Sequence, residues 1–272
     1  MKVTFLGSGA WEGIPAPFCS CTVCHIATNH PTSKNNRMRP LLLCETREGK
    51  FLLEASPDVR IQSTKFNLSP ITDFVISHWH FDHMYGLHDL LSWMKRLEKK
   101  PTVHCSKNTK EVLDREFGYL PLEINLLPPL KPFTLCGVTI TPLPVYHMFL
   151  RDNNTPQEEL ANTYGYLLEH GGKRVAYLSD YYRIPEITLE KIQGVDALIA
   201  DGTYLSTNEY ENLKPNHVHG DAILRLTKSI STKTVYYHSI SHLTRRTHEQ
   251  LQLTLPPSHF ISYDGMEIEL GN

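Results

Sequence analysis

The sequence predicts an α+β fold in which mixed sheets are covered by helices, formed by residues 1–272 as one domain. Segments rich in β-branched, leucine and aromatic residues alternate with occasional segments of helical periodicity. No low-complexity linker and no shift of composition divides the chain. A length of 272 residues is enough to bury a large core without covalent cross-links.

The predicted elements follow from apolar periodicity and from turn residues between the segments. The predicted strands are 2–7, 41–46, 50–55, 73–77, 102–105, 133–145 (a hairpin), 162–170, 174–180, 197–202 and 234–239, with two more near 259–265 and 266–270. The predicted helices are 86–100, 109–118, 187–194 and 220–230. In the first of these, Leu87, Leu90 and Leu91 fall on one face, as in a helix that packs on a sheet.

Composition excludes some classes of protein. The formal net charge of −2 gives no basic surface for nucleic acid, and the lysines and arginine of 95–100 fit the solvated end of a helix. No apolar run approaches the ~20 residues of a membrane span. The first residues, MKVTFLGSG, lack the apolar core and cleavage site of a signal peptide, so we expect a cytoplasmic protein.

Three of the six cysteines are crowded in one loop, residues 19–24. Cys19, Cys21 and Cys24 present three sulfurs from a single turn, as a tetrahedral metal site requires. The alternative is three reduced thiols in a loop. The spacing favours a metal site, which needs a fourth ligand from elsewhere in the chain.

The strongest signal is the segment HWHFDH that follows the predicted strand 73–77. His78 and His80 are two residues apart, so in an extended segment both side chains point the same way and can bind one cation. Asp82 and His83 are adjacent on a turning backbone and point elsewhere. The segment therefore favours two neighbouring metals over one four-ligand site.

Two metals need a bridging carboxylate and further histidines. His147, Asp180 and His238 each lie at or just beyond the end of a predicted strand, where α/β sites collect their ligands. A metal site that only stabilises the fold is a poorer explanation, because structural sites are closed by four ligands and here seven converge.

This pattern resembles the metallo-β-lactamase superfamily, and the resemblance covers nearly the whole chain. The stretches FLGSGAWEGIPAPFCSCTVC, YHSISH and SYDGMEI are similar to the carbon–phosphorus lyase accessory phosphodiesterase group. The cysteine loop and EASPDVR are also similar to the pyrroloquinoline quinone biosynthesis group. The resemblance implies a four-layer αββα sandwich, opening of cyclic ribose phosphates, and a homodimer.

The resemblance also implies roles for particular residues. His78, His80 and His147 match the ligands of a first metal; Asp82, His83 and His238 match those of a second; and Asp180 matches the bridge. Cys19, Cys21, Cys24 and His242 match a structural zinc site. His217 matches the general acid, with His219 as a close rival, and Asp82 is expected to act in catalysis as well as in metal binding.

Two departures from the family pattern concern these assignments. His238 and His242 are four residues apart, whereas the related group has its two histidines three apart. Glu54 stands where the superfamily usually has an aspartate that contacts a metal-binding histidine.

The expected reaction follows from the ligand types. Two cations ~3.5–4 Å apart can hold a bridging hydroxide that attacks a phosphodiester in line. The leaving alkoxide then takes a proton from His217 or His219. Histidine and carboxylate ligands suit zinc or manganese, with iron as a third option, whereas thiolates favour zinc.

Three function classes remain at this point. A hydrolase of a small phosphodiester is preferred. A cofactor-biosynthesis oxidoreductase like the pyrroloquinoline quinone group is the alternative. An RNA-processing nuclease is disfavoured by the neutral charge. The glycines of LGSGAWEG are spaced one residue too far for a dinucleotide-binding fingerprint.

Overall fold

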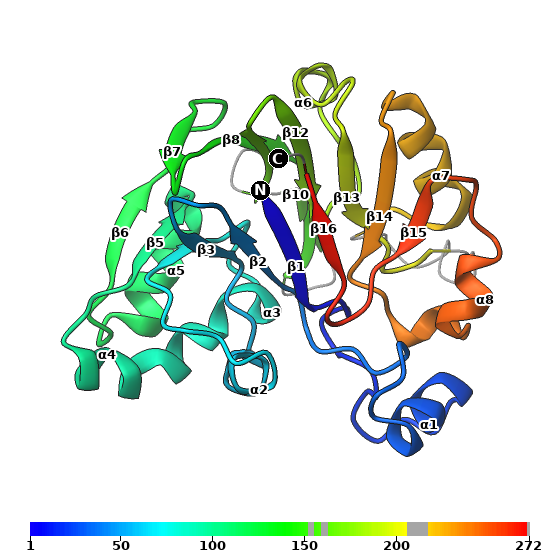
Figure 1. The fold of residues 1–272 in the computed structure, drawn as a ribbon, viewed down its shortest axis with the longest axis horizontal. Helices are drawn as coiled ribbons and strands as arrows, with labels where there is room; N and C mark the ends of the chain where they lie inside the picture. Colours follow the sequence, from blue (N-terminus) through cyan, green and yellow to red (C-terminus); the bar gives the residue numbers. More distant parts are fainter. Residues whose placement is uncertain (152–154, 159–162, 206–216, 271–272) are drawn as a thin grey trace.

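Two mixed β-sheets form the centre of the molecule, with helices on their outer faces (Figure 1). The computed structural model describes residues 1–151, 155–158, 163–205 and 217–270. The architecture is the α+β sandwich expected from the sequence. Among the described helices, none is both long and apolar enough to cross a membrane.

The first sheet contains the strands of the N-terminal half of the chain and the last strand. Its order is β16 (Glu267–Glu269), β1 (Lys2–Gly7), β2 (Leu41–Glu45), β3 (Lys50–Leu53), β4 (Asp73–Val75), β5 (Thr102–Cys105) and β6 (Glu123–Leu126). β16, β1, β2 and β3 pair antiparallel, whereas β3 to β6 pair parallel.

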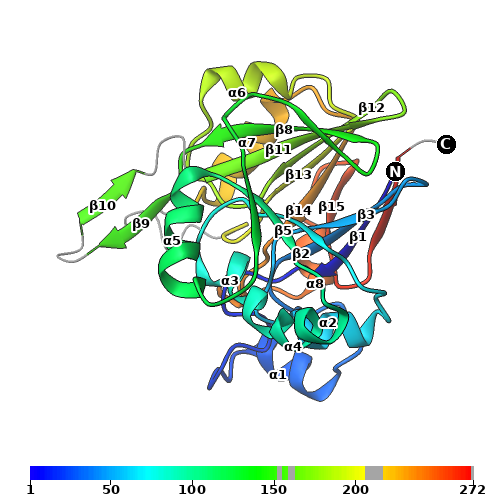
Figure 2. The same ribbon diagram turned by 90° about the vertical axis from the view of Figure 1, so that its left-hand side faces the viewer.

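The second sheet repeats this plan. Its order is β15 (His259–Ile261), β14 (Thr234–His238), β13 (Ala197–Asp201), β12 (Lys173–Leu178), β11 (Thr163–His170), β8 (Val138–Val145) and β7 (Phe133–Leu135). β12 to β15 are parallel, and the other pairs are antiparallel. A separate hairpin of β9 (Met148–Arg151) and β10 (Thr155–Glu158) projects from the body directly after β8 (Figure 2).

Helices follow the strands in both halves. They are α1 (Thr22–Asn29), α2 (Val59–Lys65), α3 (Phe81–Met84), the 3-10 turn η1 (Tyr85–Leu90), α4 (Leu91–Leu97), α5 (Lys107–Phe117), α6 (Glu186–Lys191), α7 (Gly220–Ser229), η3 (His242–Thr244) and α8 (His248–Gln252).

The core lies in three layers because alternate side chains of each strand point to opposite faces. On β12, Val175 and Tyr177 enter the layer between the sheets, whereas Ala176 and Leu178 pack toward the helices of the second sheet. On β2, Leu42 and Cys44 enter the same inter-sheet layer, and Leu41 and Leu43 pack against the helices of the first sheet. Both sheets are thus buried on two faces, which explains their apolar runs.

Most predicted strands occur within one or two residues of their expected bounds, but the predicted helix 86–100 differs. It is divided into η1 and α4, and the short helix α3 forms directly after His80. The tight turns place Gly86 against the backbone of 55–56: its N–H donates to the carbonyl of Ala55 at 2.8 Å. Any Cβ at Gly86 would lie 1.9 Å from the Ser56 carbonyl oxygen, so a regular helix with a side chain there does not fit.

Several short elements were not expected from the sequence. They are α1, α2, α3, α8, β6 and the hairpin β9–β10. The stretch 148–162, which contains this hairpin, lies partly outside the described residues.

Candidate metal centre

The carboxyl ends of parallel strands from both sheets meet at one place, and the candidate residues lie there. His78 and His80 follow β4, Asp180 follows β12, and His147 follows β8. A hydrogen bond from the Tyr164 N–H to the Ser77 carbonyl oxygen, 3.0 Å long, joins the two sheets beside the site.

The Asp180 carboxylate is the point on which the imidazoles converge. Its Oδ2 atom lies 3.4 Å from His83 Nε2, 3.9 Å from His147 Nε2 and 4.0 Å from His78 Nε2. Asp180 Oδ1 has no hydrogen-bond partner among the described residues, although the side chain is buried. An anionic oxygen among imidazole nitrogens is the arrangement expected of a carboxylate that bridges cations.

Two groups of potential ligands share Asp180. One consists of His78, His80, His147 and Asp180, and the other of Asp82, His83 and Asp180. Within each group one ligand atom per residue lies within 4.8 Å of all the others. His80 Nδ1 and His147 Nε2 are 3.0 Å apart.

Burial and neighbouring charges set the protonation of the histidines. Burial lowers the pKa of His78 well below its ordinary value and that of His80 to about 4, so both rings are neutral and able to bind a cation. Burial also lowers the pKa of His83, but the carboxylates of Asp82, Asp180 and Glu54 outweigh it and raise the pKa well above the ordinary value. Around His83 the protein therefore provides negative charge that a cation could neutralise.

Glu54 contacts His83 of the second group through Nδ1, the ring nitrogen that does not face Asp180. It follows β3 with a positive φ of 74°, which directs its fully buried side chain into the site. Its Oε2 lies 3.4 Å from His83 Nδ1 and accepts from the Ser77 N–H at 3.1 Å, while Oε1 accepts from the Tyr177 hydroxyl at 3.0 Å. The longer side chain thus reaches a candidate ligand, as the aspartate does in the superfamily pattern.

A third group lies beside the first two and includes a residue that the sequence reasoning missed. Asp201, at the end of β13, binds His217 Nδ1 through Oδ2 at 2.6 Å, and His217 Nε2 lies 3.8 Å from Asp180 Oδ2. Burial lowers the pKa of His217, but Asp201 and Asp180 outweigh it and raise the pKa to about 9. The feature that could have identified Asp201 from the sequence is its position at the end of a predicted strand, like that of Asp180.

Two predicted residues lie apart from these groups. His238 is fully buried at the end of β14, with its ring 5.5 Å from that of Phe5, and neither ring nitrogen has a hydrogen-bond partner among the described residues. His219 stacks on Tyr204, with ring centroids 4.5 Å apart and planes at 4°. His238 remains a predicted ligand of the second metal, and His219 remains a rival to His217.

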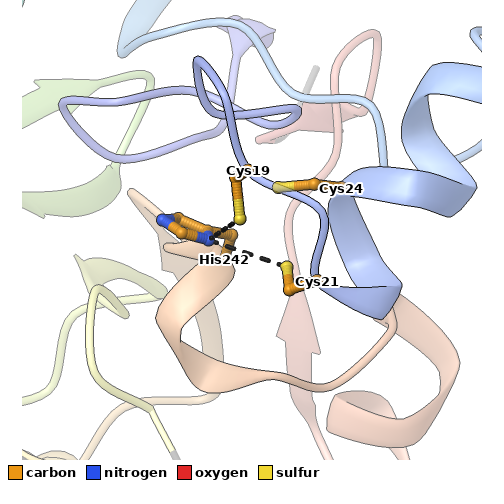
Figure 3. Close-up of side chains that lie close together, drawn as sticks. All are labelled: Cys19, Cys21, Cys24 and His242. Carbon is orange, nitrogen blue, oxygen red and sulfur yellow. Dashed lines mark hydrogen bonds between the residues drawn. The ribbon is translucent and has the colours of Figure 1, made fainter.

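The cysteine loop and η3 form a separate donor group, shown in Figure 3. His242 Nδ1 lies 3.3 Å from Cys19 Sγ and 3.7 Å from Cys21 Sγ, and Cys24 completes the group from within α1. The Ala16 N–H donates to Cys24 Sγ at 3.3 Å. Three sulfurs and one imidazole nitrogen match a structural zinc site in number and kind.

The donors at the strand ends also fit divalent cations. His78 Nε2 and His83 Nε2 are buried and without hydrogen-bond partners among the described residues. Ser77 Oγ lies 2.9 Å from the opposite nitrogen of His78, which leaves Nε2 to face Asp180. Oriented imidazoles beside buried carboxylates suit zinc, manganese or iron.

The two-sheet fold and the groups of potential metal ligands are typical of a class of metal-binding proteins that includes hydrolases. The family comparison agrees. Residues 50–240 match the model of the Beta-lactamase superfamily domain, so the chain belongs to the beta-lactamase superfamily. The match includes the HWHFDH segment and His238.

Curated relatives differ in how much of their length this chain spans. An octanoyltransferase of Porphyromonas gingivalis is 26% identical over 276 residues, which cover 98% of this chain but 51% of the relative. This chain thus spans about half of that protein. Coenzyme PQQ synthesis protein B of Methylorubrum populi is 30% identical over 224 residues, covering 77% of this chain and 75% of the relative.

Two solved structures are similar over nearly the whole chain. A new diphosphatase from the PhnP family has a TM-score of 0.81 and 26% identity, covering 98% of this chain and 96% of the other. Zn(2+)-bound PqqB from Methylobacterium extorquens has a TM-score of 0.83 and 22% identity, covering 99% and 100%. The second likeness shows the shared fold.

Proposed function

We propose that this protein is a metal-dependent hydrolase of small phosphodiesters, with cyclic ribose phosphates as the first substrates to test. The observation that carries the proposal is the convergence on Asp180 Oδ2, which has imidazole nitrogens of His78, His83, His147 and His217 within 4.0 Å. A bridging carboxylate surrounded by two ligand groups is the arrangement that a two-metal hydrolase requires.

The metals would be held by His78, His80 and His147 on one side and by Asp82 and His83 on the other, with Asp180 between them and His238 as a further ligand of the second. Two divalent cations supply activated water and stabilise charge on a phosphoryl oxygen. Zinc or manganese is the first choice, with iron as the third. A zinc ion at the cysteine group would be structural.

The protein's own residues supply the proton for the leaving group. His217 presents Nε2 to the site while Nδ1 binds Asp201, so Asp201 fixes the ring and favours the imidazolium. A protonated imidazole at this position can donate to a departing alkoxide. We assign this role to His217 rather than His219, because the His219 ring lies flat against Tyr204.

The substrate class is supported by the solved diphosphatase of the PhnP family, which shares the fold at 26% identity. A diphosphatase also cleaves a phosphate linkage. A diphosphate diester therefore belongs in the assay beside the phosphodiesters.

The test combines metal analysis with a phosphodiesterase assay. We expect about three metals per chain, one of them zinc, and turnover of bis(p-nitrophenyl) phosphate that is lost in Asp180→Ala. His88→Ala is the control, because His88 follows the HWHFDH segment, belongs to none of the ligand groups found among the described residues and has a side chain that is 58% exposed. Full metal loading without turnover of any phosphate ester would refute the hydrolase proposal.

A second candidate is a role in cofactor biosynthesis like that of coenzyme PQQ synthesis protein B. It is favoured by the 30% identity to such a protein over 77% of this chain. Metal loading without phosphate ester turnover, with iron at the strand-end site, would favour this candidate.

The remaining proposals concern the size of the substrate, the cellular location and the oligomeric state. We infer a small-molecule substrate rather than nucleic acid from the net charge of −2. We infer a cytoplasmic location because the six cysteines are all unpaired thiols. A homodimer is proposed, to be tested by light scattering.

A further inference from the structure

Glu12 is a buried carboxylate that neither ligand group uses. It lies in the turn between β1 and the cysteine loop, and its side chain is only 5% exposed. Its Oε1 accepts a hydrogen bond from the Ser241 hydroxyl, whereas Oε2 has no hydrogen-bond partner among the described residues. Burying a charged group in this way is costly unless a positive or proton-donating group faces it.

His242 is the group that faces it. His242 Nδ1 points to the sulfurs of Cys19 and Cys21, as Figure 3 shows, and its Nε2 lies 3.8 Å from Glu12 Oε1. A neutral imidazole that binds a cation through Nδ1 carries its proton on Nε2. Nε2 thus faces the Glu12 carboxylate at 3.8 Å, which is longer than a hydrogen bond. A carboxylate on this side of the ring is the group that orients ligand histidines in many zinc proteins.

The backbone holds Glu12 in this position. The N–H of Ile240 donates to the Ser8 carbonyl at 2.9 Å, and the N–H of Ala10 donates to the Ile240 carbonyl at 3.1 Å. The Ser241 hydroxyl that binds Glu12 also accepts from the Leu243 N–H at 3.0 Å, which begins the turn η3. Two backbone hydrogen bonds and the Ser241–Glu12 hydrogen bond thus join the turn that bears Glu12 to the segment that leads into His242.

We propose that Glu12 is a positioning residue of the Cys19–Cys21–Cys24–His242 metal site. It fixes the tautomer and orientation of His242 and, through Ser241, the segment that follows His238. The proposal rests on metal binding at the cysteine group, which is part of the proposed function.

Substitutions separate this role from simple packing. Glu12→Gln keeps an oxygen that accepts from Ser241 but removes the charge that faces His242. Ser241→Ala removes the hydrogen bond and keeps the charge. Glu12→Asp keeps the charge on a side chain one methylene shorter. Glu111→Gln is the control, because the Glu111 side chain is 63% exposed and pairs only with Lys107 among the described residues.

The experiment measures zinc affinity of the cysteine group in the full chain by competition with a chromophoric chelator. Cobalt-substituted protein provides a second readout, through the thiolate-to-metal charge-transfer bands. We expect Glu12→Gln to weaken zinc binding at the cysteines about 10- to 100-fold and to alter those bands. Glu12→Asp should fall between Glu12→Gln and the wild type, and Glu111→Gln should match the wild type.

Two results would overturn the proposal. One is wild-type zinc affinity and unchanged cobalt bands in folded Glu12→Gln, or in Glu12→Asp if the first variant does not fold. The other is a wild-type cysteine group that binds no metal, seen in the metal analysis before any variant is made. Failure of the hydrolase proposal is a separate outcome, because it leaves zinc at the cysteines and abolishes only turnover.

Discussion

Replacing His217 with alanine should impair hydrolysis only where the leaving group needs a proton. Burial lowers the His217 pKa, but the Asp201 and Asp180 carboxylates outweigh it and raise the pKa to about 9, so the imidazolium is the main form at pH 7. Loss of a general acid costs about 10²- to 10⁴-fold in rate, which corresponds to about 3–5 kcal/mol of transition-state stabilisation. We expect this loss for a cyclic ribose phosphate, whose leaving group is an alkoxide.

The assay compares two substrates in the same variant. Bis(p-nitrophenyl) phosphate releases a stable phenolate, so its turnover by His217→Ala should stay close to that of the wild type. Asp201→Asn should show the same selectivity at smaller magnitude, because it removes the charge that holds His217 Nδ1 at 2.6 Å. An equal loss on both substrates would refute the acid role and indicate that His217 supports metal binding. Selective loss in His219→Ala instead would assign the acid to His219.

Three further predictions concern stability and metal binding. Gly86→Ala places a Cβ 1.9 Å from the Ser56 carbonyl oxygen, and denaturant titration should show a loss of about 3 kcal/mol together with loss of strand-end metal. Gly194→Ala, with φ of +68° and no atom within 4 Å, should cost about 1–2 kcal/mol and keep its metal; equal metal loss in both would contradict the steric argument. Burial raises the pKa of Asp264 to about 6, so its contribution to stability is full below the unfolded value near 3.9 and is lost as pH rises through 6. Urea titrations at pH 4 and 7 should therefore show a difference of about 2 kcal/mol between the pH dependences of wild type and Asp264→Asn, and parallel curves would refute it. Glu54→Gln should weaken metal binding at the strand-end site about 10- to 100-fold in a competition with a chelator. If the variant binds metal with wild-type affinity, the contact with His83 is not the reason why Glu54 is buried.

Local sequence was sufficient for the strands because their apolar runs reflect burial on both faces. The hairpin of β2 and β3, for example, was predicted over 41–46 and 50–55 and occurs at 41–45 and 50–53. The short helices were missed because they have little periodicity of their own. Gly86, near the junction of α3 and η1, packs against the 55–56 backbone, and that contact joins segments 30 residues apart.

The chemistry of the site could be expected from HWHFDH, because the spacing of histidine and aspartate on an extended segment restricts which atoms share a cation. The distant residues could be proposed only as strand-end candidates. That Asp180 is the point of convergence, rather than Asp201, depends on how β12 and β13 are placed against the other sheet.

The sequence by itself indicated the fold class, the HWHFDH ligands and the cysteine loop, because these depend on residue type and near-neighbour spacing. It left the strand-end metal open among zinc, manganese and iron. The tertiary structure alone decided that Asp201 holds His217, that Glu54 reaches His83, and that Glu12 faces His242 and binds Ser241. Those contacts join residues from 16 to more than 200 positions apart. They exist because the loops that carry these residues follow strands that lie side by side within one sheet or in the two facing sheets.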